Sequence, residues 1–250
     1  MEHFRRGEIN KLVNPQTGVV YTIGRFLGEG VSGEVYESIS NNKRYAIKII
    51  TYIGNYETEV EIYDRISRYP RCNPHVVCLY DHFKVDLENP LGILVLELME
   101  GTLLPLKDEE VSEFILDMLE ALVELHAVGI VHGDINPGNI FRTYAPSLNT
   151  PTFKLGDFSE GYINAGPIGI QEEDEQMADL FFRVIYKEDH LGKLLSGRPS
   201  YPRQESTIPS DAIEEMIRRM LHEAGEERWS SEERWSSEEA LEYMLEMMNR

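Results

Sequence analysis

Cysteine is scarce in this sequence. Only Cys72 and Cys78 occur among its 250 residues, which is too few for a disulfide framework, and their spacing is not that of a zinc site. We therefore expect two free thiols in a reducing compartment, which favours a cytoplasmic location.

Long apolar runs are also missing. A membrane-spanning helix needs roughly 18 consecutive apolar residues, and residues 91–99 reach only about half that length while including the charged Glu97. The first residues lack the apolar core of a signal peptide. Both observations argue against secretion and against insertion into a membrane.

Basic residues are the third shortage. The sequence has 24 Lys and Arg against 44 Asp and Glu, which gives a net charge of −20. A surface of this sign repels nucleic acid and anionic lipid, so we expect neither as a partner. A basic protein or peptide is a compatible partner, although an acidic surface can also serve solubility alone.

What is present is typical of a globular protein. Hydrophobic residues make up 42% and charged residues 27% of the chain, and the length suits one domain or a domain of two lobes. Hydrophobic periodicity predicts a helix over 53–68 and strands over 19–26, 34–40, 44–50, 76–83 and 91–98. From residue 108 the pattern is mainly helical, ending in an amphipathic segment over 240–248. A strand-rich part followed by a helix-rich part predicts an α+β fold.

A short tandem duplication interrupts the helical part. The six residues 226–231 read Glu-Glu-Arg-Trp-Ser-Ser, and the same six follow at once as 232–237. Two copies of six residues are far below the period and number of a repeat architecture. We expect a local insertion in a surface loop.

A glycine-rich segment indicates phosphate binding. Gly28, Gly30 and Gly33 form G-x-G-x-x-G-x-V with Val35, and such a turn lets backbone N–H groups approach phosphate oxygens. A dinucleotide-binding fold would begin a helix at the third glycine, whereas here a strand pattern continues. Lys48 then follows on the next apolar strand.

Two further motifs lie in the second half of the sequence. Residues 132–139 read His-Gly-Asp-Ile-Asn-Pro-Gly-Asn, and residues 157–159 read Asp-Phe-Ser. With the glycine-rich segment and Lys48, they resemble the H-R-D-x-x-x-x-N and D-F-G motifs of eukaryotic-type protein kinases. Residues 234–241 also resemble the R-W-S-x-x-E-A-L segment near the last helix of that family. The resemblance spans about residues 18–249 and implies one kinase domain over 1–250, with a β-rich N-lobe over 1–100, a hinge near 97–101 and an α-helical C-lobe over 102–250.

The resemblance also implies a reaction: transfer of the γ-phosphoryl group of ATP to a Ser or Thr hydroxyl of a protein. Lys48 would hold the α- and β-phosphates, oriented by Glu59, with Glu57 and Glu61 as alternatives. Asp134 would accept or orient the attacking hydroxyl.

Metal and adenine ligands follow from the same resemblance. Asn139 and Asp157 would bind Mg²⁺. The backbone at Glu97 and Met99 would hydrogen-bond adenine. The purine ring would lie between four apolar residues, which are Leu27, Val35, Ala46 and Phe141, although plain core packing explains these residues equally well.

Four departures from the family pattern stand out. Gly133 replaces the arginine of H-R-D, so no cation is there to pair with a phosphorylated activation loop. Asn136 replaces the catalytic-loop lysine, and the lost charge can cost several kcal/mol of barrier. Ser159 replaces the glycine of D-F-G. The activation segment is also short, because an acidic helix is expected to start near residue 172, anchored by Asp174 or alternatively by Asp179.

Two other functions stay open at this level. The His-Gly-Asp and Pro-Gly-Asn sequences also resemble those of aminoglycoside and choline kinases, which share the fold and phosphorylate small alcohols. A pseudokinase that binds a nucleotide or only a partner is the third possibility, because Asn136 and the short segment weaken the catalytic pattern.

Overall fold

The computed structural model describes residues 10–67, 72–87, 89–144, 151–186, 208–221 and 234–249. The chain folds into two compact units, one formed by residues 1–99 with 157–161 and the other by 100–156 with 162–250. The short segment 157–161 therefore belongs to the first unit, although the residues before and after it belong to the second. None of the helices in the described ranges is long and apolar enough to cross a membrane.

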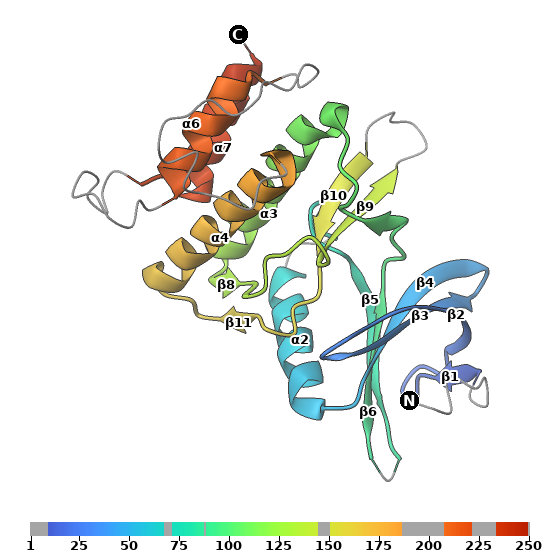
Figure 1. The fold of residues 1–250 in the computed structure, drawn as a ribbon. Coiled ribbons are helices and arrows are strands. Elements are labelled where there is room, and N and C mark those ends of the chain that lie inside the picture. The colour runs from blue at the N-terminus through green and yellow to red at the C-terminus, as the bar shows by residue number, and fades with distance from the viewer. Residues whose placement is uncertain are drawn as a thin grey trace. The chain divides into compact units, whose positions relative to one another are not determined.

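The first unit is an antiparallel sheet with one helix (Figure 1). The strand order is β1-β2-β3-β4-β6-β5. The strands are β1 (Lys11–Val13), β2 (Val20–Gly30), β3 (Gly33–Ser40), β4 (Lys43–Ile50), β5 (Leu79–Val85) and β6 (Leu91–Leu96). Helix α2 (Ile53–Ile66) packs against β4 and β6. Because β6 lies between two strands and under this helix, it is apolar and buried over almost its whole length.

The second unit is mainly helical, with two small sheets. A three-stranded sheet has the order β10-β9-β7, and β8 pairs with β11. These strands are β7 (Gly101–Thr102), β8 (Ile130–Val131), β9 (Ile140–Tyr144), β10 (Pro151–Leu155) and β11 (Tyr162–Ile163). A single 3₁₀ turn, η1 (Asp108–Glu110), leads into the first helix. The helices are α3 (Val111–Ala127), α4 (Pro167–Tyr186), α6 (Ser210–Met220) and α7 (Ser237–Met248).

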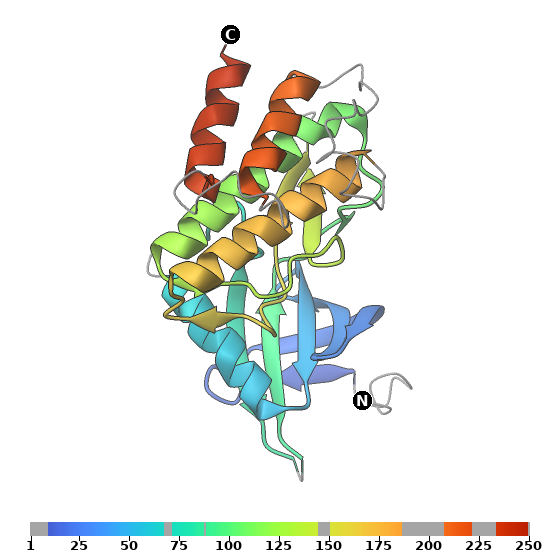
Figure 2. The ribbon, with the colours of Figure 1, turned by 60° about the vertical axis from the view of Figure 1, so that its left-hand side comes forward.

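Helix α3 is the centre of the second unit. It packs against β10, α4 and α7, and α6 packs against both α4 and α7 (Figures 1 and 2). A helix covered on several sides must be apolar around most of its circumference, and eleven residues of α3 are buried. This explains the long apolar stripe that the sequence shows from residue 111.

The elements match the sequence-based expectations closely, with a few differences. Helix α2 ends at Ile66 rather than 68, and β5 begins at Leu79 rather than 76. The short strands β1, β7, β9, β10 and β11 were not expected, because two to five residues give too little alternation to detect. Helix α4 begins at Pro167, well before the acidic cluster near residue 172. Proline suits the first turn of a helix because its missing N–H needs no partner there.

The expectation of free thiols is wrong. Cys72 and Cys78 form a disulfide, with their Cα atoms 5.5 Å apart. The bond closes a short loop over residues 72–78, directly before β5, and the separation of only six residues brings the two side chains within reach. Because disulfides are rare in reducing compartments, the cysteines no longer support a cytoplasmic location, which stays a prediction.

Residues 234–237 of the second copy lead into helix α7. Ser236 is the N-cap of α7 and forms a capping box with Glu239. Arg234 Nη1 lies 2.5 Å from Glu175 Oε1 on α4, and the Trp235 ring packs against Tyr243 with centroids 4.8 Å apart. The expectation of a loop insertion is therefore wrong for residues 234–237, while the first copy lies outside the described residues.

Candidate active site

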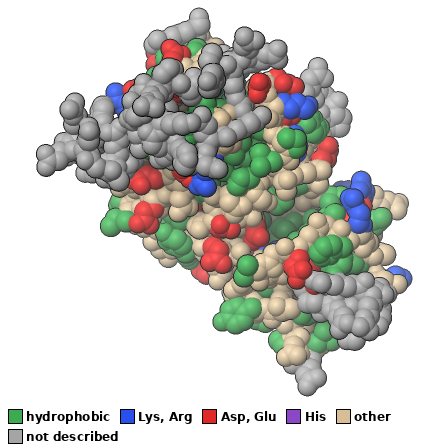
Figure 3. Space-filling model, in the orientation of Figure 1, with side chains coloured by type: hydrophobic (Ala, Val, Ile, Leu, Met, Phe, Trp, Pro, Cys, Tyr) green, Lys and Arg blue, Asp and Glu red, His purple; other side chains and the backbone are tan. Residues whose placement is uncertain are grey.

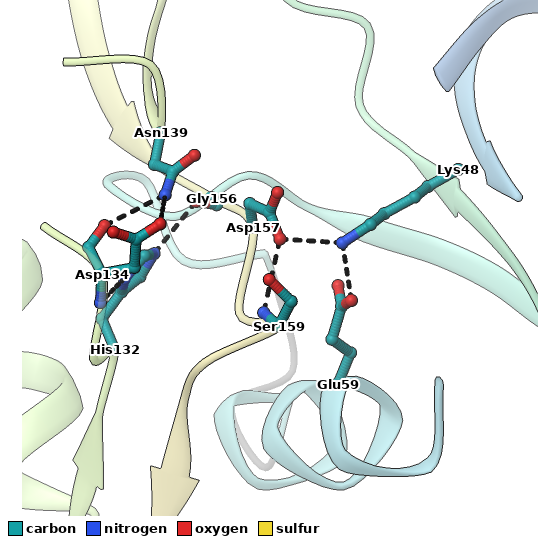
Figure 4. A network of polar contacts seen from close by, with 8 residues as sticks. All are labelled: Lys48, Glu59, His132, Asp134, Asn139, Gly156, Asp157 and Ser159. Atoms are coloured by element: carbon teal, nitrogen blue, oxygen red, sulfur yellow. Dashed lines mark hydrogen bonds and ion pairs between the residues drawn. The ribbon is translucent and has the colours of Figure 1, made fainter. Parts of the chain in front are cut away.

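Lys48 lies at the centre of a buried charged network in the first unit. Its Nζ donates to Glu59 Oε1 at 2.6 Å and to Asp157 Oδ1 at 2.8 Å (Figure 4). The side chains of Lys48 and Glu59 are only 4% and 1% exposed. Of the three glutamates considered from the sequence, Glu59 is thus the one that contacts the lysine. Glu57 pairs with Lys84 at the surface, and Glu61 is exposed.

The two carboxylates respond differently to this environment. Burial raises the pKa of Glu59, and the nearby Lys48 only partly offsets this effect. Burial would also raise the pKa of Asp157, but the charge of Lys48 and hydrogen bonds from Lys48 and Ser159 lower it below its usual value. The less buried Asp157 is therefore held as the carboxylate, which is the form that binds a cation.

The backbone around Asp157 is tightly positioned. Asp157 has φ of 67°, in the left-handed region that non-glycine residues seldom adopt. The Ser159 N–H donates to Asp157 Oδ1 at 3.3 Å. The next residue, Phe158, is fully buried and packs edge-on against Tyr63 of α2, with ring centroids 5.3 Å apart. Segment 157–161 is therefore fastened to the same helix that carries Glu59.

The glycine-rich segment forms the hairpin between β2 and β3. A Cβ at Gly33 would lie 2.3 Å from the Ile49 carbonyl oxygen, so only glycine allows this close approach to β4. A Cβ at Gly30 would point to the Asp157 carboxylate at 4.0 Å, and its absence leaves space beside that group. No atom lies within 4 Å of a Cβ built at Gly28. The hairpin tip is open, since Val31 is fully exposed.

The remaining adenine-binding candidates of the first unit lie on three strands and in the segment after β6. Leu27 is exposed, Val35 is half-buried and Ala46 is buried. The Glu97 N–H donates to the Cys78 carbonyl at 2.8 Å. This bond occupies the Glu97 N–H, and the Met99 backbone follows two residues later. Phe141 lies on β9 in the second unit.

The loop that carries Asp134 is held by hydrogen bonds within the second unit. Asn139 Nδ2 donates to Asp134 Oδ2 at 2.8 Å and to the Asp134 carbonyl at 3.0 Å (Figure 4). His132 is fully buried, with Nε2 3.0 Å from the Gly156 carbonyl oxygen. Asp134 itself is exposed. The loop therefore presents a carboxylate whose position is set by its neighbours.

Asn136 closes the same loop. Its Nδ2 donates to the Asp134 carbonyl at 3.2 Å, and its Oδ1 accepts from the Gly138 N–H at 2.8 Å. Both ends of the amide are therefore engaged within the loop. In this chain Asn136 shapes the backbone where the kinase pattern has a lysine, and it supplies no charge.

Glu173 anchors the loop to α4, contrary to the expectation of Asp174 or Asp179. Glu173 Oε1 accepts from the Gly133 N–H at 2.8 Å, and its Oε2 lies 2.9 Å from His126 Nε2. Neighbouring helix positions point about 100° apart, so the helix start decides which carboxylate faces the loop. Asp179 pairs instead with Arg183.

Asp174 belongs to the same cluster but has a different environment. Its Oδ1 lies 3.7 Å from His126 Nδ1. Burial raises the pKa of Asp174 to about 6, against lowering contributions from His126 and Ser237. The side chain of Ser237, from the second copy of the duplication, lies 3.4 Å from His126 Nδ1. The cluster that anchors the loop therefore contains one carboxyl group, that of Asp174, whose pKa is raised by burial.

Sequence reasoning missed Glu173, His126 and Arg142. Arg142 follows Phe141 on β9 and donates to the carbonyls of Thr102, Leu103 and Pro105. Its Nη1 also lies 3.4 Å from the buried Glu110. An arginine on a half-buried strand is a signal for such a role, but the identity of its partners depends on tertiary structure.

The two oxygen groups that the resemblance assigns to magnesium lie in different units, Asp157 in the first and Asn139 in the second. Asp157 offers a carboxylate, and the Asn139 amide nitrogen turns to Asp134, which leaves its oxygen for a cation. Mg²⁺ prefers oxygen ligands and is usually held by one or two side chains together with substrate phosphates. Within the described ranges, no group of three or more His, Cys, Asp or Glu forms a self-sufficient metal site. Each of the two residues thus offers an oxygen donor of the kind that Mg²⁺ binds.

Comparison with known proteins identifies the family. The family model described as protein kinase domain matches residues 21–163, which is more than half of the chain. The chain belongs to the protein kinase family. This confirms the resemblance seen in the motifs and the predicted α+β kinase fold.

Curated relatives of this kinase are serine/threonine-protein kinases. DCLK1 of Rattus norvegicus is 31% identical over 159 residues, which cover 59% of this chain and 36% of the relative. PknH of Mycobacterium bovis is 30% identical over 136 residues, 49% of this chain and 22% of the relative. DCLK2 of Homo sapiens is 30% identical over 164 residues, 59% of this chain and 20% of the relative. The chain thus matches well under half the length of each relative.

Proposed function

We propose that this chain is an active protein kinase, one domain over residues 1–250, which transfers the γ-phosphoryl group of ATP to a Ser or Thr hydroxyl of a protein. The observation that carries the proposal is the buried pairing of Lys48 with Glu59 and Asp157. A buried cation shared by two carboxylates is costly unless it serves a ligand or a specific fold. The names of the relatives support serine or threonine as the acceptor.

Each charged group has a defined task in this proposal. Lys48, fixed by Glu59, binds phosphate oxygens without first having to be oriented. The exposed Asp134 carboxylate, positioned by Asn139, accepts the proton of the attacking hydroxyl. Asp157 and Asn139 would supply oxygen ligands to Mg²⁺, and the metal would neutralise charge on the phosphates.

The backbone supports nucleotide binding at two further places. Gly28 and Gly30 leave the hairpin free of side chains where phosphates approach, and Gly30 keeps the space beside Asp157 open. The Glu97 carbonyl and the Met99 backbone are the groups proposed to bind adenine. Gly133 carries no side chain to pair with a phosphorylated residue, so we propose that activity needs no activating phosphorylation.

Nucleotide binding is tested by thermal unfolding with and without Mg²⁺-ATP. At a ligand concentration about 100 times Kd, linkage stabilises the folded state by about 2.7 kcal/mol. For a chain of this length that is a rise of several degrees in Tm. Asp157→Asn should abolish the shift, whereas Asp134→Asn, an equivalent change outside the phosphate-binding groups, should retain it. No shift of the wild-type protein at millimolar nucleotide would contradict the proposal.

A pseudokinase is the second candidate, and the Asn136 contacts favour it. The loop has no lysine at this position, and the amide that replaces it is engaged by Asp134 and Gly138. A protein of this kind would bind Mg²⁺-ATP and show the same thermal shift. It would transfer no phosphoryl group to any acceptor, which separates the two candidates.

A further inference from the structure

A pocket lies beside the catalytic loop of the second unit. Its volume is about 550 Å³. Among the described residues it is lined by residues 104–106, by residues 135–137 of the catalytic loop, and by Leu180, Arg183 and Val184 of α4. The lining is mostly apolar, and Arg183 is the charged residue in the described part of it.

The walls of this pocket are well fixed. Arg142 holds residues 102–105 through three backbone carbonyls, and Leu106 is buried. Asn136 closes the loop wall by its two hydrogen bonds, and Leu180 is only 3% exposed. A cavity with fixed, mostly apolar walls and a few polar groups is the usual form of a recognition site.

The pocket is lined by the same loop that carries the proposed acceptor-site residue Asp134. Its loop wall begins at Ile135, the residue directly after Asp134. A peptide that brings its hydroxyl to Asp134 therefore has its neighbouring residues beside this pocket. The distance between adjacent residues of an extended chain is only about 3.3–3.6 Å, so a pocket of this size accommodates side chains near the acceptor.

Arg183 determines the charge that the pocket prefers. Its side chain is 59% exposed and forms an ion pair with Asp179, four residues earlier on the same helix. Exposed pairs of this kind contribute little, and a guanidinium has five N–H donors. Arg183 can therefore bind a ligand carboxylate while keeping Asp179, and arginine–carboxylate contacts are among the strongest hydrogen-bonded pairs.

We propose that this pocket selects the protein substrate, by binding an apolar side chain together with a carboxylate close to the phosphorylated hydroxyl. The inference rests on the proposed kinase activity. It reverses the expectation that an acidic protein favours a basic substrate. Acidic side chains are indeed more widespread than basic ones on the face shown in Figure 3.

The net charge of the protein and a direct contact with Arg183 act over different distances, so they affect different properties of binding. The net charge of −20 acts on approaching partners at long range, but salt screens exposed charges over about 8 Å at physiological ionic strength. A direct contact with Arg183 is made at hydrogen-bond distance, where screening is weak. The overall charge therefore affects association rates, while the residue next to the acceptor is selected by Arg183.

The test is a panel of peptides with one Ser acceptor. Asp, Lys or Ala is placed in turn at each neighbouring position, with and without a Leu, and kcat and KM are measured at 0.15 M salt. At one position we expect Asp to exceed Lys by about tenfold in kcat/KM, mainly through KM, as for one added charge-assisted hydrogen bond. Arg183→Glu should abolish or invert this preference, and Leu104→Ser should reduce the preference for Leu.

Arg44→Glu is the matched control. Arg44 is 61% exposed and ion-paired with Glu37, much as Arg183 is with Asp179, but it lies on β4 in the first unit. The Arg44→Glu substitution introduces the same change of charge as Arg183→Glu and should leave the preference for Asp over Lys in the peptide intact. Equal rates for acidic and basic peptides, or an Arg183→Glu enzyme that keeps the wild-type preference, would overturn the inference. Absence of transfer to every peptide and protein would instead contradict the kinase proposal, and peptide affinities measured by fluorescence anisotropy would then still test the pocket.

Discussion

Removal of Lys48 should cost far more stability than removal of an exposed lysine with nearly the same ion-pair distance. Lys48 Nζ lies 2.6 Å from Glu59, and Lys84 Nζ lies 2.7 Å from Glu57 on the same helix. The side chains of the first pair are 4% and 1% exposed, and those of the second 43% and 61%. Burial, rather than distance, should therefore decide the difference.

The difference in burial gives the expected loss of folding stability for each variant. Lys48→Met leaves the buried Glu59 and the partly buried Asp157 facing each other without a cation, and an uncompensated buried charge costs about 3–5 kcal/mol. Lys84→Met should cost less than about 1 kcal/mol, as is usual for exposed pairs. For a chain of this length, 3–5 kcal/mol lowers Tm by about 10 °C. Thermal unfolding of the two variants at pH 8 measures both values.

Comparing Lys48→Met with Lys84→Met at lower pH tests whether the unpaired buried carboxylates cause the loss of stability. Without Lys48, burial raises the pKa of both carboxylates above their unfolded values, so the folded variant binds more protons than the unfolded chain. The stability deficit of Lys48→Met should therefore shrink as the pH falls from 8 to 5. Adding Glu59→Gln should also recover part of the loss. A Lys48→Met protein as stable as Lys84→Met at pH 8, or a deficit that grows on acidification, would refute this reasoning.

Three further outcomes concern other parts of the molecule. Burial raises the pKa of Asp174 to about 6, so the folded protein should lose stability as the pH rises from about 4 through 6. Unfolding curves measured over this pH range should show the decline for the wild-type protein and not for an Asp174→Asn variant. Reduction of the Cys72–Cys78 bond by dithiothreitol should cost about 2 kcal/mol, judged from the short loop it closes, and a variant with both cysteines replaced by Ser should show no response. Gly133 has φ of 79°, so Gly133→Ala should cost about 1–2 kcal/mol, whereas Gly166→Ala, with open space at its Cβ and no positive φ, should cost less than half of that.

Most of the fold was accessible from the sequence because its signals are local. The alternation in β3 and β4 and the apolar stripe of α3 each arise within one element, and the glycine-rich hairpin carries its own turn signal. The motif spacing also led to Lys48, Glu59 and Asp157, which the structure brings together.

The parts that sequence reasoning missed depend on tertiary contacts. Which carboxylate of α4 reaches Gly133 depends on where the helix starts, and Pro167 as its first residue was not foreseen. Disulfide formation depends on the path of the loop between α2 and β5, since a spacing of six residues does not itself imply pairing. The engagement of both ends of the Asn136 amide likewise depends on how the loop folds back on itself.

The most direct test of the kinase proposal is a single-turnover measurement of γ-phosphoryl transfer. Wild-type protein and Asp134→Asn are each mixed with Mg²⁺-ATP, labelled in the γ-phosphate, and with a protein mixture that contains acidic and basic acceptors. The account predicts transfer to Ser or Thr by the wild-type protein. It also predicts a loss of about 100-fold or more in Asp134→Asn, at unchanged affinity for ATP. No transfer by the wild-type protein, or equal transfer by both proteins, would contradict it.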